Sequence, residues 1–258
     1  MAPFYFATSA RSAVGLVRNG NEDSALASKH LVAVADGMGG HAAGEVASSI
    51  AVKTLAQSAK VFTHPEIDEE SGDDLYLQSI QDVDAAIKRE IEENPALSGM
   101  GTTLTSLFLR GNAVALLHIG DSRAYRLRGS SFDQLSVDHT VIQELLNQGA
   151  ISQSDIASHP QRSVLTQVLM GEGNIEVPLP LFDVKPGDRF LICSDGLSSV
   201  LTEKEIKTLL KGRDRDDAVA ALVEATYVNG APDNVTLIVA DIVEEDQADN
   251  FELIGAAE

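Results

Sequence analysis

The sequence predicts a layered α+β domain, because its strand-like and helix-like segments fall into separate runs. Apolar segments at 102–110, 112–119 and 124–128 follow one another through short turns, which is typical of antiparallel sheets. Segments with helical spacing come instead in consecutive pairs, the first pair at about 42–58 and 76–91. No internal repeat is found, so a single layered domain is expected.

In the first half of the chain, apolar runs bounded by polar turns or glycines predict strands. The helix that begins near 42 places Val46, Ile50 and Leu55 on one face. The second helix ends at Asn94, because a following proline disfavours helical backbone in the residue before it. The strands predicted in this half are 4–8, 23–27 and 31–35.

In the second half, a mostly polar segment of about 138–175 with one short helix interrupts the strands, and insertions of this length are often functional. Further on, Thr202 and Glu205 form the capping-box pattern of a helix that ends at Gly212. The remaining predicted elements are a strand at 189–194, a helix from Asp214 and a strand at 234–241.

The composition limits the classes of partner and compartment. The chain has 258 residues, 39 acidic and 19 basic, with a formal charge of −20. This charge disfavours nucleic acid and anionic membranes as partners and concentrates cations near the surface. One cysteine excludes a disulfide framework, and no apolar run approaches the ~20 residues of a membrane span, so we expect a cytoplasmic protein. The acidic segment 244–258 is expected to be a disordered tail.

Four apolar strands carry an aspartate at one end. Asp36, Asp121 and Asp195 follow their strands, and Asp233 precedes the last one. If these strand ends converge, they form a carboxylate cluster, in which two charges ~5 Å apart repel by roughly 3 kcal/mol at an effective dielectric of ~20. All-oxygen ligands favour Mg²⁺ or Mn²⁺ over zinc. Taken singly, each aspartate is more simply explained as a turn residue.

Other enzyme classes fit less well. The segment 37–42 matches a G-x-G-x-x-A dinucleotide fingerprint, but the Asp36 carboxylate would repel a pyrophosphate there. The helix that follows also does not return to a parallel strand, as the dinucleotide fold requires. Cys193 has no arginine six residues on, so it lacks the phosphate loop of cysteine-dependent phosphatases and is interpreted as a core residue.

Six short motifs occur in a characteristic order: Arg18-x-x-x-Glu22-Asp23, Asp36-Gly37-Met38-Gly39-Gly40, Gly101-Thr102-Thr103, Gly120-Asp121-Ser122-Arg123, Ser194-Asp195-Gly196 and Asp233-Asn234. Together they resemble protein phosphatase 2C, the metal-dependent serine/threonine phosphatase family, and its bacterial branch in particular. The resemblance covers about Phe4 to Ile242. It implies a four-layer α-β-β-α sandwich, with two antiparallel sheets packed face to face and helix pairs outside, within one catalytic domain at 1–243.

The resemblance also implies a centre with two tightly bound Mn²⁺ or Mg²⁺ ions and a third, weaker one. Asp36 would bridge the tight pair. Asp195 and Asp233 would complete the first of its two sites. Glu22 and the Gly37 carbonyl would help to hold the second, largely through water.

Further residues would support this centre. Asp121, together with Asp195, would hold the third ion. Asp23 and Asn234 would orient ligands and waters around the tight pair. Arg18 would offer a planar fork to two phosphate oxygens, which a lysine could not match.

The sequence leaves the general acid open. Eukaryotic members of the family place a histidine directly after the Asp-Gly pair, whereas Met38 holds that position here. His41 comes three residues later, and an alignment gap would bring it into register as the general acid. Arg123 is more simply a structural ion-pair partner than a catalyst.

The function implied by the resemblance is hydrolysis of phosphoserine and phosphothreonine in proteins by metal-activated water attack. Such bacterial enzymes usually oppose a serine/threonine kinase, so we expect phosphorylated proteins as partners and a monomeric enzyme. The alternative is a catalytically weak member that acts as a regulatory or phosphoprotein-binding module. An active enzyme is favoured because every metal-binding acid is present. The segment 138–175 would be the family's variable flap beside the active site, on which substrate choice depends.

Overall fold

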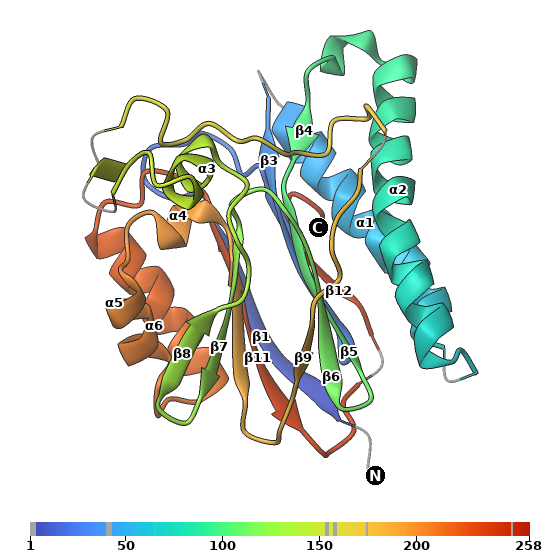
Figure 1. Cartoon of the computed structure of the whole chain (residues 1–258), viewed down its shortest axis with the longest axis vertical. Helices are drawn as coiled ribbons and strands as arrows, with labels where there is room; N and C mark the ends of the chain where they lie inside the picture. Colours follow the sequence, from blue (N-terminus) through green and yellow to red (C-terminus); the bar gives the residue numbers. More distant parts are fainter. Residues whose placement is uncertain are drawn as a thin grey trace.

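The computed structural model describes residues 4–39, 43–64, 66–152, 155–156, 159–173, 175–248 and 250–258. These residues form two antiparallel sheets packed face to face, with helices on both outer faces (Figure 1). The predicted α-β-β-α sandwich is therefore confirmed.

The first sheet, sheet A, has the strand order β1-β11-β10-β7-β8. Its strands are β1 (Tyr5–Ala13), β11 (Val235–Val243), β10 (Arg189–Cys193), β7 (Arg123–Arg128) and β8 (Ser131–Gln134). β1 is longer than predicted, because its pairing with β11 continues from Tyr5 to Ala13 although the later residues are not an apolar run. Pairing with β11 therefore extends β1 beyond the apolar residues from which the strand was predicted.

The second sheet, sheet B, has the order β12-β2-β3-β5-β6-β9, and β4 pairs with the end of β3. Its strands are β12 (Glu252–Gly255), β2 (Asp23–Ala27), β3 (Leu31–Met38), β4 (Gly101–Thr102), β5 (Leu104–Arg110), β6 (Ala113–Ile119) and β9 (Leu181–Asp183). The short edge strands β8 and β9 were not predicted. Edge strands pair on one side only, so they need little of the apolar pattern that reveals a buried strand.

The helices cover the two sheets from outside. α1 (Ala43–Phe62) and α2 (Glu69–Glu93) lie on sheet B, and α5 (Glu203–Leu210) and α6 (Arg215–Val228) lie on sheet A (Figure 1). The predicted capping box is present, since the Thr202 and Glu205 side chains each accept from the other residue's backbone N–H. The short elements are η1 (Pro95–Leu97), α3 (Val141–Asn147) and α4 (Asp195–Ser198).

Buried apolar side chains fill the space between the sheets as well as each interface between sheet and helices. Between the sheets, Phe6 of β1 and Phe190 of β10 meet edge to face at 6.1 Å, and Val34 of β3 packs in the same cluster. Cys193 is fully buried under α5 and α6, as predicted for a core residue. This packing holds the strand ends at fixed positions relative to one another.

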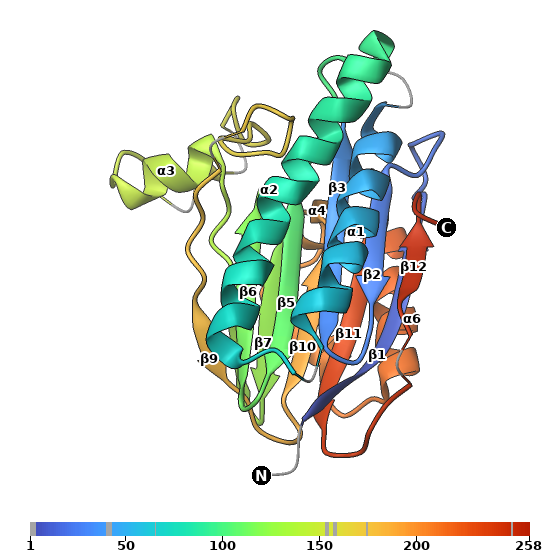
Figure 2. The same cartoon turned by 90° about the vertical axis from the view of Figure 1, so that its right-hand side faces the viewer.

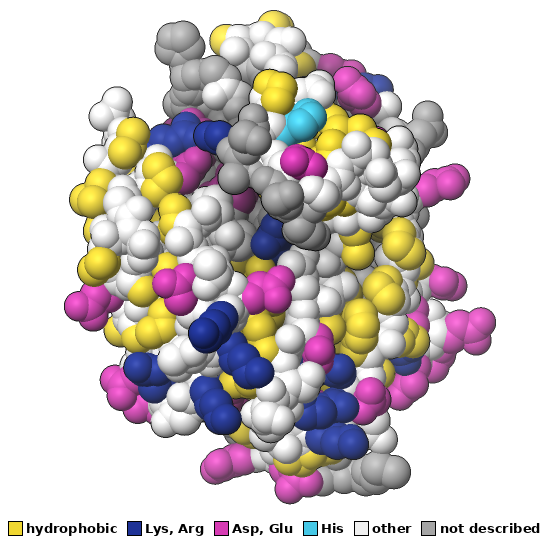
Figure 3. Space-filling view, turned by 60° about the vertical axis from the view of Figure 1, so that its left-hand side comes forward, with side chains coloured by type: hydrophobic (Ala, Val, Ile, Leu, Met, Phe, Trp, Pro, Cys, Tyr) yellow, Lys and Arg dark blue, Asp and Glu magenta, His cyan; other side chains and the backbone are white. Residues whose placement is uncertain are grey.

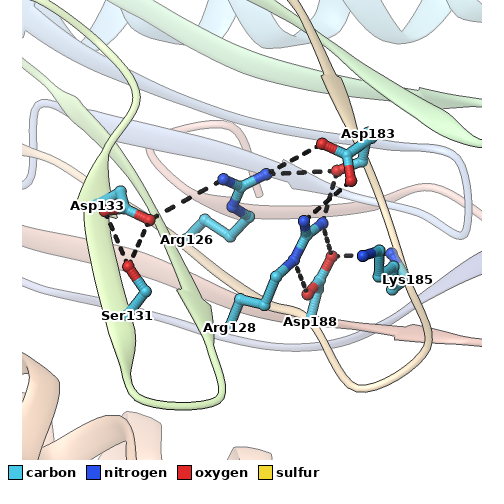
Figure 4. Close-up of polar contacts among 7 residues, drawn as sticks. All are labelled: Arg126, Arg128, Ser131, Asp133, Asp183, Lys185 and Asp188. Atoms are coloured by element: carbon cyan, nitrogen blue, oxygen red, sulfur yellow. Dashed lines mark hydrogen bonds and ion pairs between the residues drawn. The ribbon is translucent and has the colours of Figure 1, made fainter.

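Ion pairs connect the two sheets at one open side of the sandwich. Arg128 of β7 donates to Asp183 of β9 at 2.9 Å and forms a two-bond fork with Asp188, at 2.7 and 2.6 Å (Figure 4). Arg126 approaches the same Asp183 at 4.0 Å. On the face drawn in Figure 3, Lys and Arg side chains gather in the lower half with acidic side chains among them, so this basic region is locally compensated.

The prediction that 244–258 is a disordered tail is wrong for its last part. β12 pairs antiparallel with β2, and the side chains of Ile254 and Ala257 are buried. Phe251 and Leu253 pack against the cluster under α1 and α2. The acidic neighbours of these apolar residues obscure any strand pattern in the sequence. The segment becomes a strand only because it pairs with the edge of β2.

We expect Ile254→Ala to lower the free energy of unfolding by about 2–4 kcal/mol, because it leaves a cavity between the sheets. Glu252→Ala is the control, since this side chain is exposed on the same strand and its loss should cost less than about 0.5 kcal/mol. Urea unfolding measures both values. Equally small effects would mean that β12 adds nothing to stability.

Candidate metal centre

The aspartate-bearing strand ends meet at one end of the sandwich. Asp36 lies near the end of β3, and register places Asp23 of β2 directly opposite it. In sheet A, Asp195 directly follows Ser194 at the end of β10, and Asp233 lies two residues before the antiparallel partner β11. Asp121 lies between β6 and β7, and β7 pairs with β10. The aspartate-bearing strand ends therefore do converge, which is the condition that the sequence analysis set for a carboxylate cluster.

Mutual repulsion perturbs these carboxylates. Asp36 keeps a partly exposed surface, yet burial of its carboxyl group and the charges of Asp23 and Asp195 raise its pKa well above the ordinary value. Asp121 and Asp233 add to the same effect. Burial, followed by repulsion from Asp195 and Asp138, raises the pKa of Asp121 to about 7. Without a cation nearby, this end of the fold favours protonated acids.

Asp195 responds to the same surroundings. Burial and the charge of Asp233 raise its pKa, and the positive charges of Arg18 and Arg123 partly offset the shift. A divalent cation beside this carboxylate would offset the repulsion further.

The chemistry of these side chains fits Mg²⁺ or Mn²⁺, since the donors are carboxylate oxygens without His or Cys. Within the described ranges, however, no three His, Cys, Asp or Glu side chains already stand together as a metal-binding group. The acids are close enough to shift one another's pKa but do not form a closed coordination shell. Water molecules would have to complete the shell of any ion bound here.

Glu22 and its neighbours are held by side chains from elsewhere in the chain. Asn234 Oδ1 accepts from the Glu22 N–H at 2.8 Å, and its amide nitrogen donates to the carbonyls of Val14 and Gly20, both at 2.8 Å. Asp23 is buried and accepts from the Ser194 hydroxyl at 2.7 Å. Asp23 and Asn234 therefore fix the backbone that carries Glu22 and Asp195, in agreement with a supporting role.

Gly37 leaves no room for a side chain. A Cβ atom there would lie 2.0 Å from the Gly44 carbonyl oxygen and 2.6 Å from that of Glu22. Gly37 also donates its N–H to the Glu22 carbonyl at 3.1 Å. The start of α1, the end of β3 and the Glu22 turn thus pack backbone against backbone, which only glycine permits.

Arg18 contacts one of the candidate ligands. Its guanidinium donates to Asp233 Oδ2 at 2.7 Å, and this hydrogen bond is the main cause that raises the Arg18 pKa. The other Asp233 oxygen accepts from the Asn234 N–H at 2.8 Å. The arginine lies beside the carboxylates, and any anion that bound it would have to compete with Asp233.

The remaining predictions have different outcomes. His41 lies outside the described residues. Arg123 forms a fork with Asp138, at 3.0 Å from Nε and 2.6 Å from Nη2, so it is the structural ion-pair partner that the sequence predicted.

Two threonines hold the backbone of Asp36, a role that the sequence did not reveal. Asp36 donates its N–H to Thr103 Oγ1, and its carbonyl accepts from the Thr102 hydroxyl and the Thr103 N–H, all at 2.9 Å. The Gly101-Thr102-Thr103 motif was the available signal. The motif lies more than sixty residues after Asp36 in the sequence, and no local pattern indicates that two such distant segments are in contact.

A stacked pair of histidines next to Gly120, of which His118 is buried and His139 partly buried, also had no signal in the sequence. The rings of His118 and His139 stack at 4.9 Å, and His139 Nδ1 accepts from the Gly120 N–H at 3.2 Å. Burial lowers the pKa of His118 to about 3, and its Nδ1 bonds to the Thr105 hydroxyl at 2.8 Å. Its Nε2 bonds to the Val137 carbonyl at 3.1 Å, so His118 is buried with both ring nitrogens hydrogen-bonded, which is typical of a structural residue.

The protein phosphatase 2C family pattern matches residues 21–232. The chain belongs to the protein phosphatase 2C family. It is 41% identical over 250 residues to the serine/threonine protein phosphatase PstP of Mycobacterium tuberculosis (strain ATCC 25618 / H37Rv). This match covers 96% of the chain and 47% of PstP, so the chain spans about half the length of that relative.

Other members of the family are similar over nearly their whole length. The serine/threonine phosphatase stp of Listeria monocytogenes serotype 4b is 37% identical over 235 residues, which is 88% of this chain and 92% of that protein. A crystal structure of the catalytic domain of PstP in complex with two manganese ions superposes with a TM-score of 0.84 and 38% identity, and covers 93% of this chain and 99% of that one. Among the helices of the described residues, none has the length and apolar character to span a membrane.

In EDTA, the free energy of unfolding of this phosphatase 2C chain should fall as the pH rises from about 4 to about 7. Asp23 and Asp121 have ordinary pKa values of 3.8 that folding raises to about 7. Protonation therefore favours the folded state fully below 3.8, and the advantage is lost as the pH rises through about 7. Urea unfolding at several pH values measures the slope.

Asp121→Asn is the matched variant for this experiment, because it removes one of the two acids whose pKa is raised to about 7 and keeps the side-chain shape. It should flatten the dependence on pH. An unchanged slope would show that Asp121 does not contribute to it.

Proposed function

We propose that the chain is a metal-dependent protein serine/threonine phosphatase that hydrolyses phosphoserine and phosphothreonine. The observation that carries the proposal is the set of mutually repelling, largely buried carboxylates at one end of a sandwich of this family. Such a set is stabilised by divalent cations, and a phosphate ester is attacked readily where cations neutralise its charge.

Asp36 would be shared by a pair of Mn²⁺ or Mg²⁺ ions, Asp195 and Asp233 would help to hold the first, and Glu22 with the Gly37 carbonyl would help to hold the second. When bound, the pair supplies a water whose pKa lies near neutrality and which attacks phosphorus in line. The protein keeps the bridging carboxylate still, because Thr102 and Thr103 bind the Asp36 backbone on both sides. Rigid placement of ligands is what such a reaction requires.

Asp121 and Asp195 hold a third, weaker ion in this proposal. Support comes from their mutual repulsion, which contributes to the raised pKa of Asp121. Asp138 repels Asp121 as well, yet Asp138 is neutralised by the Arg123 fork. Asp121 therefore retains more uncompensated charge than Asp138 and is the better ligand of the two.

Arg18 binds the phosphate of the substrate. Its guanidinium lies at the rim of the carboxylate cluster on Asp233 and is half exposed, so an incoming phosphate can reach it. Because a metal ion on Asp233 weakens the attraction between that carboxylate and the arginine, metal loading frees the guanidinium for the anion. Phosphate binding and metal binding are therefore coupled through Asp233.

The substrates are phosphorylated proteins, and the enzyme opposes a serine/threonine kinase of the same cell. This part rests on the relatives named as serine/threonine phosphatases and on the flap-like segment 138–175 next to Asp121. The cytoplasmic location, the monomeric state and the role of His41 as general acid stay predictions from the sequence.

Hydrolysis of p-nitrophenyl phosphate and of phosphothreonine peptides should require added Mn²⁺ or Mg²⁺ and stop in excess EDTA. The physical reason is that carboxylates alone can neither lower the pKa of water nor neutralise the phosphate. Activity measured against metal concentration tests this, and full activity in EDTA would end the proposal. Metal-dependent phosphopeptide binding without turnover would support a binding module instead.

Two variants separate the roles of the acids in the same assay. Asp36→Asn should abolish both activity and the rise in melting temperature with Mn²⁺, since a ligand that binds only the folded state stabilises it. Asp121→Asn should keep most of that rise and lose more than about tenfold in activity. If both variants lose the Mn²⁺-dependent rise in melting temperature equally, Asp121 does not belong to a weaker site than Asp36.

Arg18→Ala should raise KM with a smaller fall in kcat, because the guanidinium binds phosphate in ground and transition states alike. A charge-assisted fork suggests a loss of about 1.5–3 kcal/mol in kcat/KM, roughly 10- to 150-fold. Steady-state kinetics at saturating Mn²⁺ measure the split. An unchanged kcat/KM would place Arg18 outside the site.

A further inference from the structure

The buried carboxylate of Asp84 lies outside the metal centre and binds the end of the flap segment, residues 138–175. Asp84 belongs to α2 and is only 3% exposed. Its Oδ1 accepts from the Gly171 N–H and its Oδ2 from the Gly173 N–H, both at 2.7 Å. Burying a carboxylate is costly unless its oxygens accept hydrogen bonds, so these two amides are the reason that Asp84 can be buried.

The backbone of the segment is shaped for this contact. Gly171 and Gly173 both have left-handed φ angles, of +79° and +75°. A Cβ atom on Gly171 would lie 2.8 Å from backbone atoms of Lys88, so the segment packs directly against α2. One turn of α2 away, the Gln81 side chain donates to the Ile175 carbonyl at 2.5 Å. The helix therefore holds Gly171, Gly173 and Ile175 at successive points.

Both ends of the flap segment contact backbone next to candidate metal-centre residues. At its exit, Leu169 and Thr102 exchange two backbone hydrogen bonds of 3.0 Å, and the Thr102 hydroxyl donates to the Asp36 carbonyl. At its entry, the His139 N–H donates to the Gly120 carbonyl at 2.8 Å, one residue before Asp121. The position of Leu169 thus depends on the Asp84 contact two residues further on.

Between these anchors the segment closes on itself. The Val141 N–H donates to the Val164 carbonyl at 3.0 Å, and the Thr166 N–H to the His139 carbonyl at 2.9 Å. Beyond this closure, α3 projects outward from the ends of the sheets (Figure 2). The described part of the segment is therefore a unit whose orientation is set at its two ends.

We propose that Asp84 is a positioning residue for protein substrates, which fixes the exit of the flap segment and so the surface that a phosphoprotein contacts beside the metal centre. The proposal rests on the proposed function. A small phosphate ester reaches the centre without touching this surface, whereas a protein chain on either side of the phosphorylated residue extends over it. Loss of the Asp84 contact therefore weakens protein substrates selectively.

The variant is Asp84→Asn, which keeps the side-chain shape but sets an amide NH₂ against one of the two glycine N–H groups. Asp82→Asn is the matched control, because Asp82 is exposed on the same helix. Hydrogen exchange followed by mass spectrometry should show at least tenfold faster exchange in peptides covering 165–173 for Asp84→Asn, and no change for Asp82→Asn. Exchange in α2 itself should stay unchanged in both.

Kinetics provide the second measurement. Asp84→Asn should raise KM for a phosphothreonine protein at least fivefold and leave kcat/KM for p-nitrophenyl phosphate within twofold. Equal losses on both substrates, or unchanged kinetics on both, would overturn the proposal. If the wild-type protein hydrolyses neither substrate, the proposed function fails, and the exchange experiment still decides whether Asp84 anchors the segment.

Gly173→Ala keeps Asp84 and its buried surroundings, and serves if Asp84→Asn does not fold. Gly173 has open space around its Cβ position, so alanine adds only strain from the left-handed backbone. This variant should show the same selective rise in KM for the protein substrate. Normal kinetics with faster exchange at 165–173 would overturn the link between the anchor and substrate choice.

Discussion

Repulsion among carboxylates at one end of the sandwich is the constraint on which the rest of this structure depends. Asp23, Asp36, Asp121, Asp195 and Asp233 are brought together by strand ends. Burial, followed by repulsion within this group, raises the pKa of Asp23, Asp36, Asp121 and Asp195. Such a group lowers stability unless protons or cations compensate it. Arg18, which donates to Asp233, and Arg123 offset the raised pKa of Asp195 only in part, so a cation from solution is needed to complete the compensation.

The rest of the fold opposes this repulsion with rigidity. The apolar layer between the sheets fixes the strand ends from behind, and neutral side chains fix the backbone around the acids. Thr102 and Thr103 hold Asp36, while Asn234 holds the Glu22 turn. Hydroxyl and amide groups suit this task, because they satisfy buried backbone groups without adding charge to a site that must attract a cation.

Specific polar contacts also hold the flap segment at its two ends. Its entry is tied by the Arg123–Asp138 fork and its exit by the two amides on Asp84. Each anchor pairs a carboxylate with donors of its own, which allows both acids to be largely buried, although the charge of Asp138 still contributes to the raised pKa of Asp121.

The sequence by itself determined the α+β layering, the strands that end in aspartate, and the family, because apolar periodicity and short motifs are local features. Helix caps such as Thr202 with Glu205 were predictable for the same reason. Only the tertiary structure decided which distant residues meet: Arg18 with Asp233, and Asp84 with two glycines of the flap segment. It also turned the acidic end of the chain into a strand, because pairing partners far apart in sequence leave no local pattern.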